Sequence, residues 1–164
     1  MKVGDLNSLE MRKLFEFAQQ DERFGVAFRG ALSQIRHKLY LESLGFSIEG
    51  TQSDNAGEPD FIINGDSTME HKRARSKTYP DGSLKVELQK SRGKVPERLY
   101  DTAFSDIVAV DVSHHTGITN DYRYAHTSSL RRHNTHPNKI AAMQKIDDRW
   151  VSDLDILLGD NQCK

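Results

Sequence analysis

The sequence feature that most constrains the fold is one short apolar run, residues 106–112 (DIVAVDV). Its β-branched residues favour an extended strand, and its apolar side chains occupy alternate positions on both faces. A strand that is apolar on both faces must be covered on both sides, so it belongs in the middle of a sheet. We therefore expect residues 106–112 to form the central strand of a sheet that other layers cover.

Two segments before this strand have helical periodicity. Residues 6–21 place apolar side chains at roughly helical spacing, and Asn7 or Asp5 is suited to cap the start. Residues 29–44 are more regular, and Gly45 follows them in the position where glycine commonly ends a helix. The apolar positions of this second helix are Ala31, Leu32, Ile35, Leu39 and Leu44.

Shorter strands are expected around the central one, at residues 46–48, 59–64, 68–72, 85–90 and 122–125. The tripeptide Asn64-Gly65-Asp66 indicates a tight hairpin between the second and third of these. We further expect a helical turn near residues 97–103, a turn at 113–121, a basic loop at 126–139 and helix in two pieces at 140–158. Together these predict an α/β fold, a mixed central β-sheet flanked by helices.

The length of 164 residues fits one domain. Within it we expect an N-terminal helical extension (1–28), a core (29–126), and a basic loop with a C-terminal helix (127–164). The single cysteine, Cys163, excludes an intramolecular disulfide or a zinc site made of cysteines. No segment approaches the ~18 apolar residues of a membrane span, and the first ten residues lack a secretory apolar stretch. We expect a cytoplasmic protein with no membrane partner.

Basic residues are concentrated locally, although the formal net charge is only −1. Residues 71–98 are strongly basic, and a second basic patch spans residues 131–139. A neutral protein with a basic face suits an enzyme that holds phosphates in one groove. The residues expected to contact DNA are Arg73, Arg75, Lys77, Lys90, Arg92, Lys94, Arg131 and Arg132.

Residues 57–72 (GEPDFIINGDSTMEHK) carry the most informative group of charged side chains. Asp60 opens one expected strand, whereas Glu70 and Lys72 lie on the next. Alternate residues of a strand face the same way, so Glu70 and Lys72 share a face. A hairpin about Gly65 brings Asp60 opposite the neighbourhood of Glu70. The side chain of His71 points away, but its backbone carbonyl remains nearby.

This group of side chains suits phosphodiester hydrolysis. The carboxylates of Asp60 and Glu70, with the main chain of His71, form an oxygen site for Mg²⁺, for which Mn²⁺ can substitute. Such a metal polarises the phosphate and acidifies a bound water. Lys72 can position or deprotonate the attacking water, or stabilise charge on the phosphate.

Pro59-Asp60 followed by Glu70-x-Lys72 resembles the PD-(D/E)xK nuclease superfamily, which includes restriction enzymes and Holliday-junction resolvases. The helix that ends in Leu44-Gly45-Phe46 and the strands through residue 112 follow the order of elements in that family. The resemblance implies a restriction-endonuclease-like core, DNA as substrate and a Mg²⁺-dependent endodeoxyribonuclease. It also implies Gln89 as a further catalytic residue, because many members place a glutamine on the following element.

One position departs from the family pattern. Several members carry an acid in the first helix that adds a metal ligand, whereas this sequence has Gln34 near that position and Glu42 close to the helix end. The resemblance therefore supports a first metal site rather than a second. Small endonucleases that cut both strands often work as symmetric dimers, so a homodimer is also expected.

Alternatives from other functional classes remain open. A non-catalytic nucleic-acid-binding module, or a protein-interaction subunit of a defence or repair complex, would keep the same fold. The histidines at 114, 115, 126, 133 and 136 lack the spacing of a zinc site. No motif for a serine nucleophile, a nucleotide-phosphate loop or a dinucleotide is present, so no nucleotide cofactor is expected.

Overall fold

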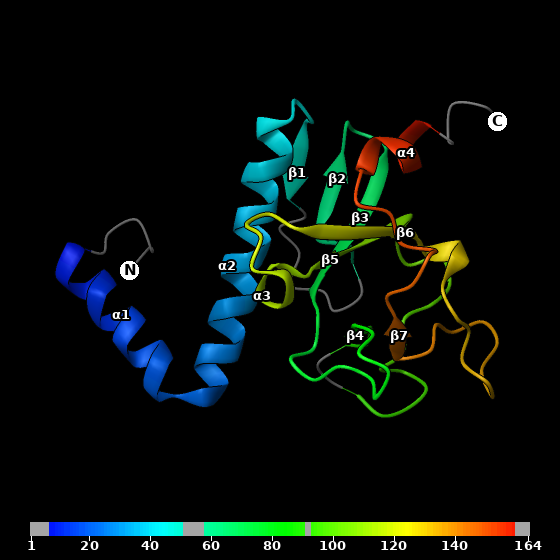
Figure 1. The fold of residues 1–164 in the computed structure, drawn as a ribbon, viewed down its shortest axis with the longest axis horizontal. Helices are drawn as coiled ribbons and strands as arrows, with labels where there is room; N and C mark the ends of the chain where they lie inside the picture. Colours follow the sequence, from blue (N-terminus) through cyan, green and yellow to red (C-terminus); the bar gives the residue numbers. More distant parts are fainter. Residues whose placement is uncertain (1–6, 51–57, 91–92, 160–164) are drawn as a thin grey trace.

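A computed structural model describes residues 7–50, 58–90 and 93–159, and a mixed five-stranded sheet lies at its centre (Figure 1). The strands are β1 (Ile48–Gly50), β2 (Phe61–Ile63), β3 (Ser67–Arg73), β5 (Ile107–Asp111) and β6 (Tyr122–His126), in the order β1-β2-β3-β5-β6. Strands β3 and β5 are parallel, and the other neighbours are antiparallel. Every residue of β5 is buried, and β5 lies between β3 and β6. This confirms the predicted interior strand that is covered on both faces, although β3 is the middle strand of the five.

Different layers cover the two faces of this sheet. Helices α2 (Glu22–Ser43) and α4 (Leu154–Gly159) cover one face, over a core that includes Ile107 and Ala109 of β5. On the other face, Val108 and Val110 pack against residues of a small second sheet, β4 (Lys85–Glu87) paired with β7 (Met143–Lys145), and its loops. The predicted α/β architecture, a mixed sheet flanked by helices, is therefore confirmed.

The β2–β3 hairpin has the register that the sequence predicted. Phe61 pairs with Met69, so Asp60 lies opposite Glu70 one step further along the strands. Asn64 and Gly65 both have positive φ angles, 51° and 84°, as the tight turn requires. The pairing sets the faces: His71 lies toward α2, whereas Glu70 and Lys72 lie on the opposite face.

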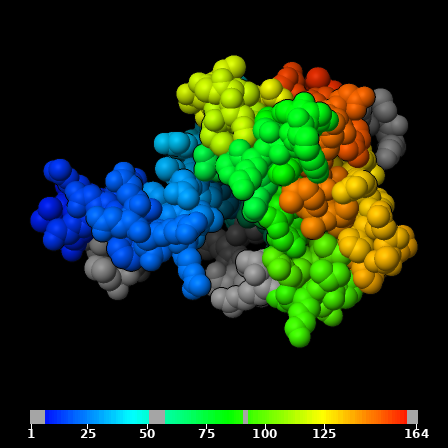
Figure 2. All heavy atoms as spheres, turned by 60° about the horizontal axis from the view of Figure 1, so that its bottom comes forward, coloured from blue at the N-terminus to red at the C-terminus, as the bar shows by residue number. Residues whose placement is uncertain are grey.

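Helices α1 (Ser8–Gln20) and α2 form a helical hairpin whose first arm extends away from the sheet (Figures 1 and 2). Asn7 caps α1 and Glu10 completes a capping box, as expected for one of the two predicted caps. Gly25 makes the close crossing of the helices possible, because a Cβ there would lie 2.3 Å from the carbonyl oxygen of Ala18. Gly45 ends α2 with φ of 95°, which confirms the predicted stop.

The side of α2 that faces the sheet differs from the apolar stripe that the sequence suggested. Ser33, His37 and Leu41 are buried there, at intervals of four residues. Ile35 and Leu39 are 56% and 60% exposed. Helix α2 also begins at Glu22, so the boundary drawn between residues 28 and 29 falls inside a continuous helix.

Three local predictions were wrong. Residues 140–158 are not two helical pieces: they form β7 and a loop before α4, because Gln144 is buried and its side-chain amide bonds to the backbone of Arg131 and Ala141. Residues 97–103 form turns and isolated bridges, in which Leu99 pairs with Gln89. The expected turn at 113–121 begins with a short helix, α3 (Ser113–Thr116). A short 3₁₀ helix, η2 (Thr127–Ser129), follows β6.

Candidate active site

Asp60, Glu70 and Lys72 lie close together beside β3. Glu70 and Lys72 project from the face of β3 opposite to His71. Lys72 donates to Glu70 through Nζ and Oε1 at 2.5 Å. Glu70 is only 3% exposed, whereas the side chain of Lys72 is 27% exposed and reaches the surface. The ion pair therefore joins a nearly buried carboxylate to an amine that reaches the surface.

Tyr100 fixes the orientation of Glu70 from the side of the small second sheet. Its hydroxyl donates to the same Oε1 at 2.7 Å, and its ring stacks on Phe104 with centroids 4.0 Å apart. The ammonium of Lys72 lies 5.5 Å from the centre of the Tyr100 ring. Burial opposes the charge on Lys72, but the attraction of Glu70 and then of Tyr100 outweighs it and raises the pKa of Lys72. Lys72 is therefore a permanent cation in the metal-free site. The sequence did not single out Tyr100.

Asp60 approaches the same point from the edge of β2. Its Oδ2 accepts the backbone N–H of His71 at 2.8 Å, and its carboxylate also bonds to the side chain of Gln34. Burial and then the negative charge of Glu70 raise the pKa of Asp60 to about 6. The bond from His71 and the charge of Lys72 only partly offset that rise. Asp60 and Glu70 therefore repel one another when both are ionised.

This donor set fits a divalent cation. A cation between two carboxylates removes the repulsion that, after burial, raises the pKa of Asp60. The N–H and C=O of one strand residue point toward the same neighbour, so the carbonyl of His71 lies on the same side of β3 as Asp60. Within the residues that the structure describes, no group of three or more His, Cys, Asp or Glu side chains is placed to hold a metal. A cation here would therefore depend on two carboxylates, main-chain oxygen and water.

A cavity of about 230 Å³ opens beside Asp60 and Lys72, whereas Glu70 is not among its lining residues. It is lined by Gly30 and Gln34 of α2, by Asp60, and by the consecutive residues His71, Lys72 and Arg73 of β3. Gln34 occupies the position where the family resemblance led us to look for an acid, and it does contact Asp60. The cavity places an amide, a carboxylate and two cations around one small volume.

Gln89 lies apart from this group. It pairs with Leu99 just beyond β4, and its side-chain amide donates to Glu87. Glu87 in turn pairs with Arg75, whose Nη1 lies 2.7 Å from its carboxylate. The link between Gln89 and the site is indirect, since Leu99 directly precedes Tyr100. Its catalytic role stays a prediction.

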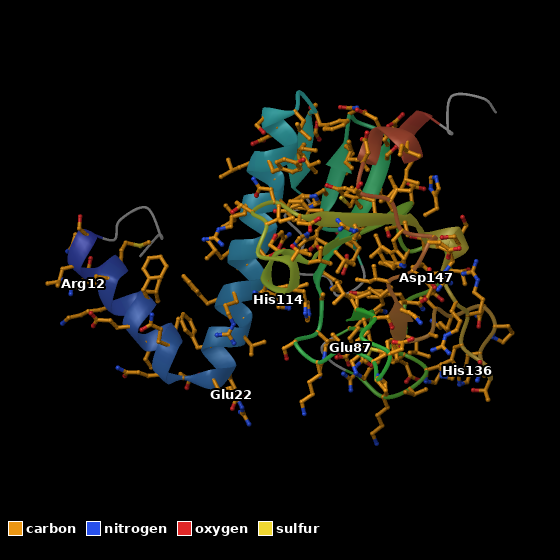
Figure 3. The ribbon with its side chains drawn as sticks, viewed as in Figure 1. Arg12, Glu22, Glu87, His114, His136 and Asp147 are labelled. Atoms are coloured by element: carbon orange, nitrogen blue, oxygen red, sulfur yellow. The ribbon has the colours of Figure 1, made fainter. Side chains whose placement is uncertain are left out.

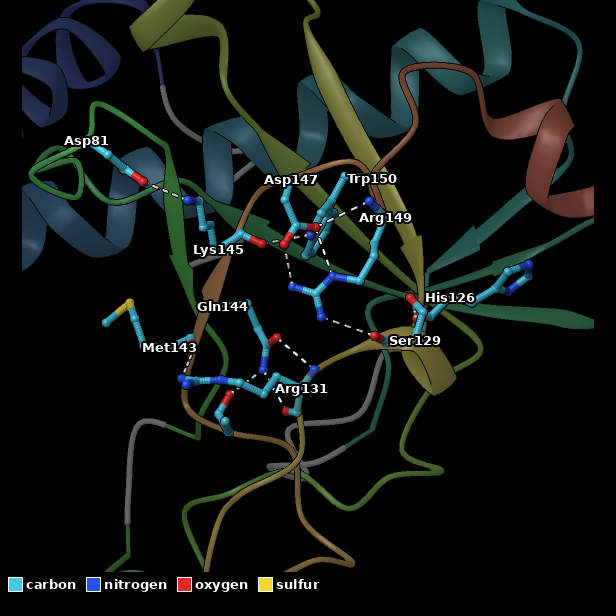
Figure 4. A network of polar contacts seen from close by, with 11 residues as sticks. Asp81, His126, Ser129, Arg131, Met143, Gln144, Lys145, Asp147, Arg149 and Trp150 are labelled. Carbon is cyan, nitrogen blue, oxygen red and sulfur yellow. Dashed lines mark hydrogen bonds and ion pairs between the residues drawn. The ribbon is translucent and has the colours of Figure 1, made fainter.

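The residues expected to contact DNA are spread over two regions. Arg73 lines the cavity, Arg75 and Lys77 follow β3 on the surface, and Lys94 is exposed, whereas Arg92 lies outside the described residues. Arg131 and Arg132 belong to the loop before β7, where the guanidinium of Arg131 donates to the carbonyl of Met143 (Figure 4). Arg132 donates to the carbonyl of Ser128 at 3.4 Å. These two arginines therefore also hold their own loop together.

A buried chain of polar side chains runs between α2 and the sheet, and the sequence analysis missed it. The hydroxyl of Tyr124 lies 3.0 Å from Nε2 of His37, and Nδ1 of His37 lies 3.0 Å from Nδ1 of His71. Nε2 of His71 lies 3.0 Å from Oγ of Ser33, which donates to Asp111 at 2.5 Å. The hint in the sequence was Ser33 and His37 at helical spacing opposite the strand residue His71.

Ser33, His71 and Asp111 do not form a hydrolytic triad. In such a triad the acid bonds to the histidine nitrogen that faces away from the serine. Here Asp111 bonds to the serine itself, and the other nitrogen of His71 faces His37. Burial, followed by the charge of Lys72, lowers the pKa of His71 to about 3. These residues position β3 against α2 rather than react.

Among the described residues, no helix is long and apolar enough to cross a bilayer. No protein-family model matches the sequence, and no curated protein matches it. Among solved structures, the chain is similar to the bacterial homing endonuclease I-Ssp6803I, with a TM-score of 0.54 and 11% sequence identity. The similarity covers 84% of this chain and 96% of that one. At this identity the similarity shows a shared fold.

Proposed function

We propose that this protein is a metal-dependent endodeoxyribonuclease of the PD-(D/E)xK type. The observation that carries the proposal is the convergence of Asp60, Glu70 and Lys72 on the β2–β3 hairpin, beside a cavity that opens to the surface. The fold shared with a homing endonuclease supports DNA as the substrate class. Two neighbouring carboxylates whose charges repel, with the main chain of His71 beside them, support a divalent cation as their partner.

Mg²⁺ or Mn²⁺ would be held by Asp60, Glu70 and the main-chain carbonyl of His71, and when bound it would polarise the scissile phosphate and acidify water. Tyr100 and Lys72 keep Glu70 oriented toward the site. Because its pKa is raised, Lys72 carries a proton and donates to a phosphate oxygen or to the attacking water. Arg73, in the wall of the same cavity, is placed to bind a phosphate.

The test is cleavage of plasmid, linear and branched DNA in Mg²⁺, Mn²⁺ or EDTA by wild type, Asp60→Asn and Asp66→Asn. Asp66 is the matched control because it is an exposed acid in the turn of the same hairpin. We expect Asp60→Asn to lose at least about a hundredfold in rate, since even the outer partners of metal ligands are commonly worth 10–100-fold. Asp66→Asn should cut like wild type.

Cleavage that persists in EDTA, or that Asp60→Asn retains, would refute the proposed site. If no DNA is cut, a gel shift on the same samples separates the remaining functions. Salt-dependent retention of DNA would favour a binding module, and absence of retention would favour a protein-interaction subunit.

A further inference from the structure

A second, larger cavity of about 750 Å³ lies where α2 passes the ends of β3 and β5. Helix α2, α3 and the start of β6 form its walls, and Figure 3 shows His114 of α3 beside α2. Its volume falls within the range of cavities that hold small organic ligands. The side chains that matter for its chemistry are Arg29, Arg36, Arg73, Tyr40, Tyr122 and Asn120.

The cavity carries an excess of positive charge. Three arginines line it, and Asp111 is the one acid among its lining residues. Asp111 is already engaged by the hydroxyl of Ser33 and the backbone N–H of Ser113, and it lies 3.9 Å from Arg73. Arg29 and Arg36 form no ion pair with any residue of the described chain. Two unpaired guanidinium groups on one cavity wall favour an anionic ligand.

The other parts of the wall suit a flat ring. Tyr40 is half-buried, and its ring lies 5.5 Å from that of Tyr122 at an angle of 31°. Leu39, on the same wall, is 60% exposed. Aromatic and apolar side chains beside arginines are the combination that binds a base together with its phosphate. The side chain of Asn120 offers both a donor and an acceptor to a base edge.

The two cavities are adjacent. Arg73 lines both of them, and it directly follows Lys72 of the candidate active site. On α2, Gly30 and Gln34 face the small cavity, whereas their neighbours Arg29 and Ser33 face the large one. A strand whose phosphate lies at Lys72 therefore has its next nucleotides within reach of the large cavity.

We propose that the large cavity binds one nucleotide of the DNA strand that crosses the candidate active site, with its phosphate on Arg29 and Arg36 and its base against Tyr40. This inference rests on the proposed function, because it takes DNA as the ligand. It identifies a binding site outside the acid-acid-lysine group, and it makes α2 part of the DNA-binding surface.

The test measures binding of a fluorescein-labelled single-stranded oligonucleotide by fluorescence anisotropy. EDTA is present so that no cleavage occurs. The variants are Arg29→Gln, Arg36→Gln and Tyr40→Leu. Arg23→Gln is the control, since Arg23 is an exposed arginine in the first turn of the same helix. Figure 3 labels Glu22, the residue before it, at the elbow between α1 and α2. Each cavity variant should weaken binding about tenfold, and each arginine variant should also reduce the salt dependence by about 0.7 in log–log slope. Arg23→Gln should bind like wild type.

An abasic nucleotide moved along the oligonucleotide tests the base contact. At one position it should weaken binding to wild type but not to Tyr40→Leu. Free thymidine monophosphate should bind more weakly than the strand and should compete with it. Equal binding by Arg36→Gln and Arg23→Gln, or an abasic effect that is the same at every position, would overturn the inference. Because the readout is metal-free binding, a protein that binds in this way but never cuts would refute the nuclease and leave the nucleotide site standing.

Discussion

Acidification should destabilise the metal-free protein through its two buried imidazoles. His71 and His37 are 6% and 0% exposed, and each has its ring nitrogens within 3.0 Å of another polar atom. Burial, followed by the charge of Lys72, lowers the pKa of His71 from 6.5 to about 3. Burial, followed by the proximity of His71, lowers that of His37 as well. The unfolded chain therefore binds protons near pH 6.5 that the folded chain does not bind.

The sign and size follow from these pKa values. A histidine whose folded pKa is lowered contributes stability above pH 6.5 and loses it as the pH falls toward about 3. For His71 the loss between pH 7 and pH 5 is about 2 kcal/mol. Asp60 acts in the opposite direction, because its folded pKa is raised from 3.8 to about 6. Its protonation adds about 1 kcal/mol to the free energy of unfolding as the pH falls from 7 to 5. His37 adds to the loss, so the net change is destabilising.

The assay is urea unfolding at pH 7, 6 and 5 in EDTA, followed by the fluorescence of Trp150, the single tryptophan and a buried one. Wild type should lose stability steadily across this range. Asp60→Asn should lose about 1 kcal/mol more than wild type, because it lacks the opposing carboxylate. A free energy of unfolding that is equal or higher at pH 5, or an identical pH slope in Asp60→Asn, would refute the assignment of two neutral buried histidines.

Two further substitutions and one measurement of mass test other parts of the structure. Tyr100→Phe removes the hydroxyl that donates to Glu70, so we expect slower DNA cleavage and a loss of about 1 kcal/mol in urea unfolding; unchanged cleavage would contradict the orienting role. Gly25→Ala should separate α1 from α2 because of the 2.3 Å approach to Ala18, which faster proteolysis within α1 would reveal, while the Trp150 unfolding transition stays in place. The homodimer expected from the sequence predicts twice the chain mass in light scattering, and a monodisperse monomer with DNA bound would exclude it.

The parts of the fold that the sequence predicted correctly are those that local chemistry determines. A strand with every residue buried, a turn with two positive φ angles and a glycine at the end of α2 each leave a pattern within a few residues. The grouping of Asp60, Glu70 and Lys72 was predicted for the same reason, since strand alternation and one hairpin bring them together. Their catalytic role stays a prediction. Residues 140–158 were misread because β7 depends on contacts with β4 and with Arg131, which lie far away in the sequence.

The polar side of α2 is the clearest case of a feature that local sequence does not predict, because its burial depends on hydrogen bonds to distant residues. Ser33 donates its proton to Asp111, so it must accept from Nε2 of His71. Nδ1 of His71 is then an acceptor, so His37 donates from Nδ1 and accepts from Tyr124 at Nε2. With both histidines neutral, every contact in this chain joins one donor to one acceptor. Helical periodicity alone assigns polar residues such as Ser33 and His37 to solvent. Here their hydrogen bonds hold β3, and with it Glu70 and Lys72, against α2.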